Sequence, residues 1–159
     1  DAAGTMWAIS PTNFTGLKSL WSYASGAAIA NNWYDGTTDT VQFGTAGGKV
    51  VVLNASTGAV LNSSYPYTLD ASDPITAAPL YYRGVLVVGT SKGKVYFIDR
   101  DTGGGAAIIK MVDFGSTQSV SSIAFDSTTS RYMVSTSSAA NDGRLYYFDL
   151  VSDPTSSSS

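Results

Sequence analysis

The chain has 159 residues, enough for one domain with a hydrophobic core, and it contains no Cys and no His. All 12 acidic residues are Asp, and Ser and Thr together make up about a quarter of the chain. The formal net charge of −3 and the absence of a basic run exclude the clustered positive surface typical of nucleic-acid binding, and they give no support for binding to anionic membranes.

The composition favours an all-β protein, because strong helix formers are scarce and β-branched and turn-forming residues are common. Without Cys there are no disulfides, and the low Lys content and the Ser/Thr/Asn/Gly-rich turns favour an extracellular, cell-surface or periplasmic location in a bacterium. No apolar run approaches the ~20 residues of a transmembrane segment. No signal peptide stands at Asp1, so we expect any export signal to have been removed or to lie upstream.

The first two strands are predicted over Gly4–Ile9 and Leu17–Tyr23, and they form the outer two strands of a partial sheet unit spanning residues 1–25. Residues 26–70 and 71–115 each divide into four strands bounded by turn residues, which makes them two complete units. Their strands are Ala27–Tyr34, Thr40–Thr45, Lys49–Asn54 and Ala59–Tyr65 in the first unit, and Ile75–Tyr82, Val85–Gly89, Lys94–Ile98 and Ala106–Val112 in the second.

Residues 116–151 hold three strands of a last unit, predicted over Val120–Phe125, Arg131–Thr136 and Arg144–Phe148. Residues 152–159 form a Ser-rich tail that we expect to be disordered.

An internal repeat connects these units. The stretch from Gly89 to Gly103 matches the stretch from Gly44 to Gly58 in residue type, position by position. Each copy has a glycine that is expected to supply the positive φ of a hairpin turn, and these marker glycines recur about every 45 residues, as in propeller blades: Gly4, Gly48, Gly93 and Gly143.

The predicted fold is therefore an all-β, β-propeller fragment of four-stranded antiparallel blades, two complete and two partial. Closed propellers need at least ~4 blades, and an open stack exposes sheet edges and apolar blade faces. We therefore expect the missing part of the same polypeptide, or another chain, to complete the ring. An open, solenoid-like array is the alternative.

The repeat Gly-x-Val-Tyr-Phe-Ile-Asp-x-x-Thr-Gly at Gly93–Gly103, its copy at Gly48–Gly58 and the pair Leu20-Trp21 resemble the PQQ-like, quinoprotein-type β-propeller repeat. That blade is shared by quinoprotein dehydrogenases, outer-membrane assembly lipoproteins and the propellers of type IV pilus tip adhesins. In style, Gly4–Ile9 and Gly143–Leu150 are most similar to the pilus-tip group. The resemblance implies a propeller fold and leaves these functions open.

No catalytic residue is predicted. Without His, Cys or Glu, catalytic triads, thiolate chemistry and ordinary zinc sites are not available within this chain. The resemblance implies that a dehydrogenase of this type would use an Asp base, calcium and often a vicinal disulfide, and no such disulfide can form here. We therefore expect no enzyme activity and no cofactor from this chain.

Calcium is the one metal to consider, and Asp99 and Asp101 are the candidate ligands because hard cations prefer oxygen ligands. Asp70 and Asp73 are weaker candidates. The competing interpretation is that Asp99 caps its own turn, since Asn54 and Asp149 occupy the same repeat position. The cap is favoured, because the closing Glu of a calcium loop is missing.

The sequence thus predicts a non-catalytic extracellular interaction or structural module, such as a pilus- or surface-associated adhesin or an assembly protein, that binds through the loops at the blade ends. The alternatives are a fragment of a PQQ-dependent quinoprotein dehydrogenase and a periplasmic outer-membrane assembly scaffold that pairs its strand edges with client proteins.

Overall fold

The computed structural model describes residues 3–10, 18–101, 105–140 and 142–149. The Ser-rich tail predicted at 152–159 lies outside these residues. The described chain contains strands and turns and no helix, and so no helix that could span a membrane. The strands in chain order are β1 (Thr5–Ser10), β2 (Lys18–Ala24), β3 (Ile29–Asp35), β4 (Thr40–Thr45), β5 (Lys49–Asn54), β6 (Tyr67–Thr68), β7 (Leu80–Tyr82), β8 (Val85–Gly89), β9 (Lys94–Asp99), β10 (Ala107–Asp113), β11 (Ser119–Asp126), β12 (Arg131–Ser137) and β13 (Arg144–Asp149).

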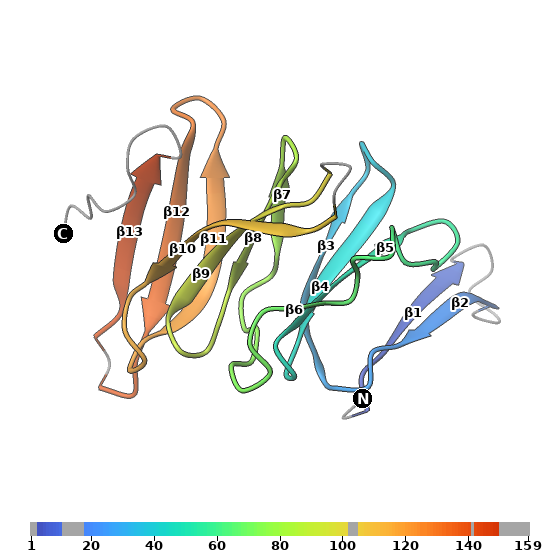
Figure 1. Ribbon diagram of the computed structural model, residues 1–159, viewed down its shortest axis with the longest axis horizontal. Helices are drawn as coiled ribbons and strands as arrows, with labels where there is room; N and C mark the ends of the chain where they lie inside the picture. Colours follow the sequence, from blue (N-terminus) through green and yellow to red (C-terminus); the bar gives the residue numbers. More distant parts are fainter. Residues whose placement is uncertain (1–2, 11–17, 102–104, 141, 150–159) are drawn as a thin grey trace.

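These strands form four antiparallel sheets that follow one another along the long axis of the molecule (Figure 1). Their strand orders are β1-β2, β3-β4-β5-β6, β7-β8-β9-β10 and β11-β12-β13. Two sheets therefore have four strands and two are smaller, which confirms the predicted all-β class with two complete and two partial units. We call these sheets blades 1 to 4. The residue limits assigned to the units from sequence stay a prediction.

The predicted fourth strand of blade 2, Ala59–Tyr65, is wrong. Only one isolated bridge, Leu53 to Val60, forms there, and the fourth strand is the two-residue β6 further along. The chain turns instead at Asn62, whose side-chain oxygen accepts a hydrogen bond from the Ser64 amide. Pro66 follows and has no N–H to donate to a ladder, so regular pairing resumes only after it.

The predicted first strand of blade 3, Ile75–Tyr82, is shorter in the structure. Its start is reduced to one bridge between Ile75 and Thr90, and β7 begins after Pro79. The amides of Thr76 and Ala77 both donate to the carbonyl of Gly89, which breaks the regular register.

Three of the four marker glycines have the predicted backbone conformation. The φ angles of Gly4, Gly48 and Gly93 are 69°, 66° and 74°. A Cβ at Gly48 would stand 1.7 Å from the carbonyl oxygen of Asp70, so the position also needs glycine for space. Gly143 is different, because its φ lies outside the left-handed region. The loop before it is longer, and Asp142 accepts the hydroxyl of Ser138 there.

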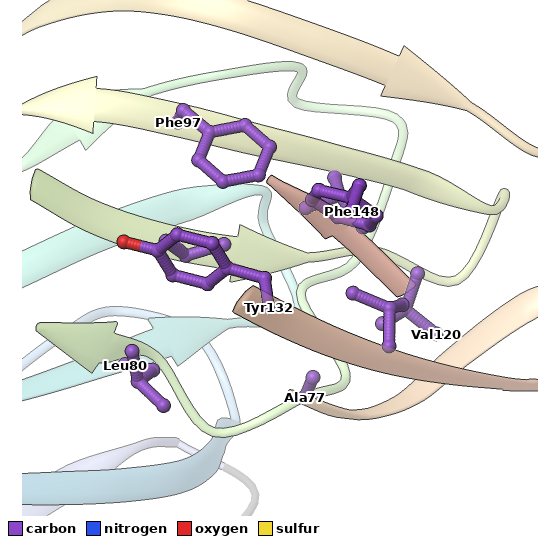
Figure 2. Close-up of a cluster of buried hydrophobic side chains, with 9 residues drawn as sticks. Ala77, Leu80, Phe97, Val120, Tyr132 and Phe148 are labelled. Carbon is purple, nitrogen blue, oxygen red and sulfur yellow. The ribbon is translucent and has the colours of Figure 1, made fainter. Parts of the chain in front are cut away.

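The hydrophobic core lies between neighbouring sheets. Val50 and Val52 of blade 2 pack against blade 3, and a second cluster joins blade 3 to blade 4. Figure 2 shows part of this second cluster, in which the Phe97 ring meets the Tyr132 ring edge-on at a centroid distance of 5.3 Å. On the other face of blade 2, Phe43 and Val51 pack against side chains of blade 1, so each four-stranded sheet is apolar on both faces.

A glycine and a β-branched residue approach each other closely at two interior junctions, the one between blades 2 and 3 and the one between blades 3 and 4. A Cβ at Gly44 of blade 2 would lie 2.1 Å from Cγ2 of Ile75 in blade 3, and one at Gly89 would lie 2.3 Å from Cγ1 of Val120 in blade 4. Beside each contact a backbone hydrogen bond links the sheets. The Ile75 amide donates to the Thr45 carbonyl at 3.1 Å, and the Val120 amide donates to the Thr90 carbonyl at 2.9 Å. A glycine facing a β-branched residue thus sets how closely these blades pack.

Candidate functional site

The calcium candidates Asp99 and Asp101 follow β9, and their contacts favour the turn cap. The Asp101 amide donates to the Asp99 carboxylate at 3.3 Å. At the same repeat position the Asn54 side-chain oxygen accepts the amide and the hydroxyl of Thr57, both at 2.8 Å. The predicted capping role is confirmed at these two positions.

Asp101 is engaged by neighbouring side chains. Its carboxylate accepts the Arg100 guanidinium at 2.7 Å and the hydroxyl of Tyr81. A carboxylate already neutralised by Arg100 is a poor ligand for a divalent cation. No group of three Asp residues that could hold a metal occurs in the described ranges.

The weaker candidates, Asp70 and Asp73, hold the loop between blades 2 and 3. Asp73 is 1% exposed, and its carboxylate accepts the Thr90 hydroxyl at 2.8 Å and the Lys92 amide at 3.0 Å. The pKa of Asp70 is lowered, chiefly by hydrogen bonds from Ser72. Asp70 also pairs with Lys94 at 3.5 Å, so both carboxylates tie the β8–β9 hairpin to the preceding loop.

Arg100 is the functional group that the sequence analysis missed. Its side chain is 2% exposed and its Cζ lies 3.3 Å from the ring centroid of Tyr81. It also crosses to blade 2, where Nη1 donates to the Thr40 hydroxyl at 3.0 Å. The only sequence signal was a cation flanked by Asp99 and Asp101 where the other copy has Asn-Ala-Ser. The geometry is that of a buried polar clamp between two blades.

Two polar atoms near this junction are buried without a hydrogen-bond partner in the described chain: Nε2 of Gln42 and the hydroxyl of Tyr65. Burial is also the main reason why the pKa of Tyr65 is raised to about 12. Arg100, Asp101 and Asp99 all act electrostatically on the Tyr65 hydroxyl, which therefore belongs to the polar surroundings of the clamp.

The end of the sheets away from Arg100 has a hollow of about 450 Å³. Short side chains on the start of β3, the β4–β5 hairpin and the segment before β7 surround it, and none of the lining residues is titratable: Ala28, Ile29, Ala30, Asn31, Ala46, Pro74, Ile75 and Thr76. The hollow is shallow and open to solvent, so a partner would meet it mainly by surface contact and hydrogen bonding.

Large apolar side chains are exposed at several places on the described surface, including Trp33 and Tyr34 of β3 and Val60 and Leu61 after β5, and three further groups lie on other strands. These three groups lie on β1 and β2, on the outer strand β10 and on β13: Trp7, Ile9 and Leu20; Ile108, Ile109 and Met111; Leu145 and Tyr147. Exposed apolar groups on strand faces and edges mark surfaces that other protein segments can cover.

No protein-family model matches the chain, and no curated protein matches its sequence significantly. Solved structures do match. Sqt1 from Chaetomium thermophilum superposes with a TM-score of 0.74 at 12% identity over 95% of this chain and 39% of its own. BamB from Moraxella catarrhalis superposes with a TM-score of 0.65 at 16% identity, over 94% of this chain and 48% of its own. The computationally designed Ika4 protein superposes with a TM-score of 0.59 at 18% identity, over 82% of this chain and 73% of its own.

This chain therefore spans less than half the length of the two natural proteins. At these identities the likeness concerns the fold alone. The neighbours are β-propeller proteins, so the chain has the fold of a run of propeller blades.

Proposed function

We propose that the chain is a non-catalytic interaction module that binds a protein partner in the hollow at the β4–β5 end of its blades. The observation that carries this is the lining of the hollow, which is small, partly apolar and free of titratable groups. Asn31 and Thr76 add hydrogen-bonding groups at its wall. A recess of this chemistry fits a side chain or a short extended segment of another protein.

We further propose that the module works outside the cytoplasm, as part of a surface-exposed or pilus-associated adhesin or assembly protein, and that further blades from the same polypeptide or another chain complete the ring. The support is the Ser/Thr-rich, Lys-poor composition and the pilus-tip style of Gly4–Ile9 and Gly143–Leu150. Labelling of intact source cells with a membrane-impermeant reagent tests the location. Labelling only after lysis would contradict it.

Filling the hollow tests the binding. Ala46 lies exposed in its wall, so Ala46→Trp should occupy the recess without disturbing the core, and Ala59→Trp is a matched exposed control outside the hollow. Beads carrying the chain are measured for attachment to surfaces coated with extracellular proteins. We expect Ala46→Trp to abolish attachment and Ala59→Trp to keep it. Equal attachment of both variants, or no attachment by the parent chain, would contradict the proposal.

A second candidate function, strand addition to client proteins as by an assembly scaffold, is favoured by the outer strand β10. Ile109 and Met111 are 56% and 45% exposed on this edge strand, on either side of Lys110, and exposed apolar groups on an edge favour the addition of another strand. Replacing both by Lys should remove client-strand binding while leaving binding at the hollow unchanged.

A quinoprotein role has less support, because Asp99 and Asp101 are already engaged by a turn and by Arg100. Addition of quinone and calcium to the chain should produce no cofactor absorbance. A bound, coloured cofactor would reinstate the enzyme interpretation.

A further inference from the structure

The outer face of blade 4 matches, by repeat position, faces that are buried in blades 2 and 3, but the described residues leave it uncovered. We define the blade 4 face by Met133 and Ser135 of β12 and Leu145 and Tyr147 of β13. The neighbouring residues on β13 point the other way, since Phe148 is in the core shared with blade 3 and Tyr146 stacks on Phe114. Because side chains alternate along a strand, Leu145 and Tyr147 face away from blade 3.

The repeat gives each of these residues a counterpart. Leu145 and Tyr147 are 51% and 46% exposed, whereas the residues at the same two positions of the complete blades are each 0% exposed: Val50, Val52, Val95 and Phe97. In the complete blades this face is buried by the blade that follows. Blade 4 thus has apolar residues at the positions of Val95 and Phe97, but no described residue covers them.

The inner edge of the blade 4 face also has a counterpart of the residue pair that contacts the next blade in blades 2 and 3. Gly44-Thr45 and Gly89-Thr90 each receive the first strand of the next blade, with the threonine carbonyl accepting its amide. Ser135-Thr136 occupies the same place in β12. The one change is that a residue with a Cβ replaces the glycine.

We propose that the blade 4 face is the docking surface for a further propeller blade, one whose inner strand places a glycine opposite Ser135. The inference rests on the proposed completion of the ring and names the surface and the partner that would achieve it. The incoming strand donates an amide to the Thr136 carbonyl, and its apolar face covers Leu145 and Tyr147.

The glycine follows from the distances at the existing junctions. A Cβ at Gly89 would stand 2.7 Å from the Cβ of Val120, and one at Gly44 would stand 2.5 Å from the Cβ of Ile75. Two Cβ atoms cannot approach so closely. Since Ser135 already has a Cβ, the spacing between blades can stay the same only if the incoming residue has no Cβ, which means a glycine.

The Ser135 hydroxyl does not need the incoming blade as a partner. Its Oγ lies 2.9 Å from the Ser121 hydroxyl and 2.8 Å from the Ser122 hydroxyl, both on β11 of the same sheet. The serine is therefore held within blade 4, and its Cβ remains the obstacle that the incoming strand must accommodate.

A second copy of this chain fits the surface poorly. The residue that it would bring to Ser135 is Ile29, the counterpart of Ile75 and Val120, and Ile29 has the branched Cβ that the junction cannot hold. The marker glycines Gly4 and Gly48 show that β1 is equivalent to β5, the third strand of a blade. The β1 of a second copy would therefore compete with β13, which is already the third strand of blade 4. The occupant is therefore a distinct blade.

A tandem chain tests the proposal. Because Asp99 and Asp149 occupy the same repeat position, a second copy of residues 100–149 inserted after Asp149 supplies a fourth strand for blade 4 and the inner three strands of another blade. Three versions are made: the unmodified insert, the insert with Val120→Gly in its own sequence, and the insert with Ser135→Gly in the original blade 4.

The readout is a single thiol. The chain has no Cys, so Leu145→Cys in the original blade 4 reports the exposure of the face through its rate of reaction with a thiol reagent. Leu145→Cys in the 159-residue chain is the exposed reference, and Val95→Cys, at a position that is 0% exposed, is the buried one. We expect at least a roughly tenfold slower reaction in the two glycine versions and a rate near the exposed reference in the unmodified tandem chain.

Fast reaction in all three versions would overturn the docking surface. Slow reaction in the unmodified tandem chain, or in the Ser135→Gly version alone, would overturn the requirement for glycine. Binding at the hollow is measured on the same proteins with the bead assay. Its failure would count against the proposed function and leave the docking result unaffected.

Discussion

Gly89→Ala is the substitution that tests the packing between blades most sharply. The φ of Gly89 is not in the left-handed region, so alanine there is not strained by its backbone, and on that ground alone it would stabilise by about 0.4–1 kcal/mol. The added Cβ would lie 2.3 Å from Cγ1 of Val120 and 3.2 Å from the Cβ of Ala77. Overpacking of this kind costs about 1–3 kcal/mol, so the clash outweighs the entropic gain.

The assay is urea unfolding together with a thermal scan. A loss of about 1–3 kcal/mol corresponds to a fall in Tm of about 2–12 °C for a domain of this size. Gly36→Ala is the control, since its Cβ would meet nothing closer than the Tyr34 ring at 3.5 Å, and its stability should stay within about 0.5 kcal/mol of the parent.

The cause of the loss is checked with a double mutant. Val120→Gly removes the side-chain atoms that the Cβ added by Gly89→Ala would strike, so Gly89→Ala should cost almost nothing in that background, with a coupling energy of about 1–3 kcal/mol. A Gly89→Ala variant as stable as the parent, or one whose cost is unchanged by Val120→Gly, would refute the reasoning.

Three further predictions concern charge, pH and metal. Arg100→Met should lower the free energy of unfolding by about 2–3 kcal/mol in urea, because it removes the hydrogen bond to the buried Thr40 and the ion pair with Asp101. Arg144→Met, at a side chain that is 62% exposed, should cost less than about 1 kcal/mol, and equal costs would contradict the buried clamp. Burial raises the pKa of Tyr132 to about 12, so this tyrosine ionises at lower pH in the unfolded state than in the folded state. The stability that comes from its neutral form is fully present below about pH 10 and is lost as the pH rises towards 12. Tyr132→Phe should reduce that alkaline loss in pH-dependent melts, and an unchanged pH profile would count against it. Calcium and chelator should leave Tm unchanged if Asp99 caps its turn, and a calcium-dependent rise in Tm would restore the metal site.

The interior strands could be predicted from sequence because local signals agree there. β4, β5 and β8 have the predicted bounds, since each is a short run rich in β-branched residues that ends at a turn residue. The sheet edges could not be predicted as well. The pattern around Val60 favoured a strand, but the turn at Asn62 and the missing amide of Pro66 determine the path of the chain.

The candidate site was predictable only where the chemistry is local. The cap at Asp99 involves residues two positions apart and follows from the repeat. The burial of Arg100 depends on Thr40, which is 60 residues away, and on the face of the Tyr81 ring. The hollow likewise combines three separated segments around Ala46. No periodicity in a single sequence reveals such meetings between blades.

The most direct test of the account is a set of nuclear Overhauser measurements on methyl-labelled protein across the two interior junctions. Side-by-side blades predict strong contacts from the Ile75 methyls to the α protons of Gly44 and from the Val120 methyls to those of Gly89. A spectrum that keeps the strand chemical shifts but lacks both contacts would contradict the packing of these sheets as propeller blades.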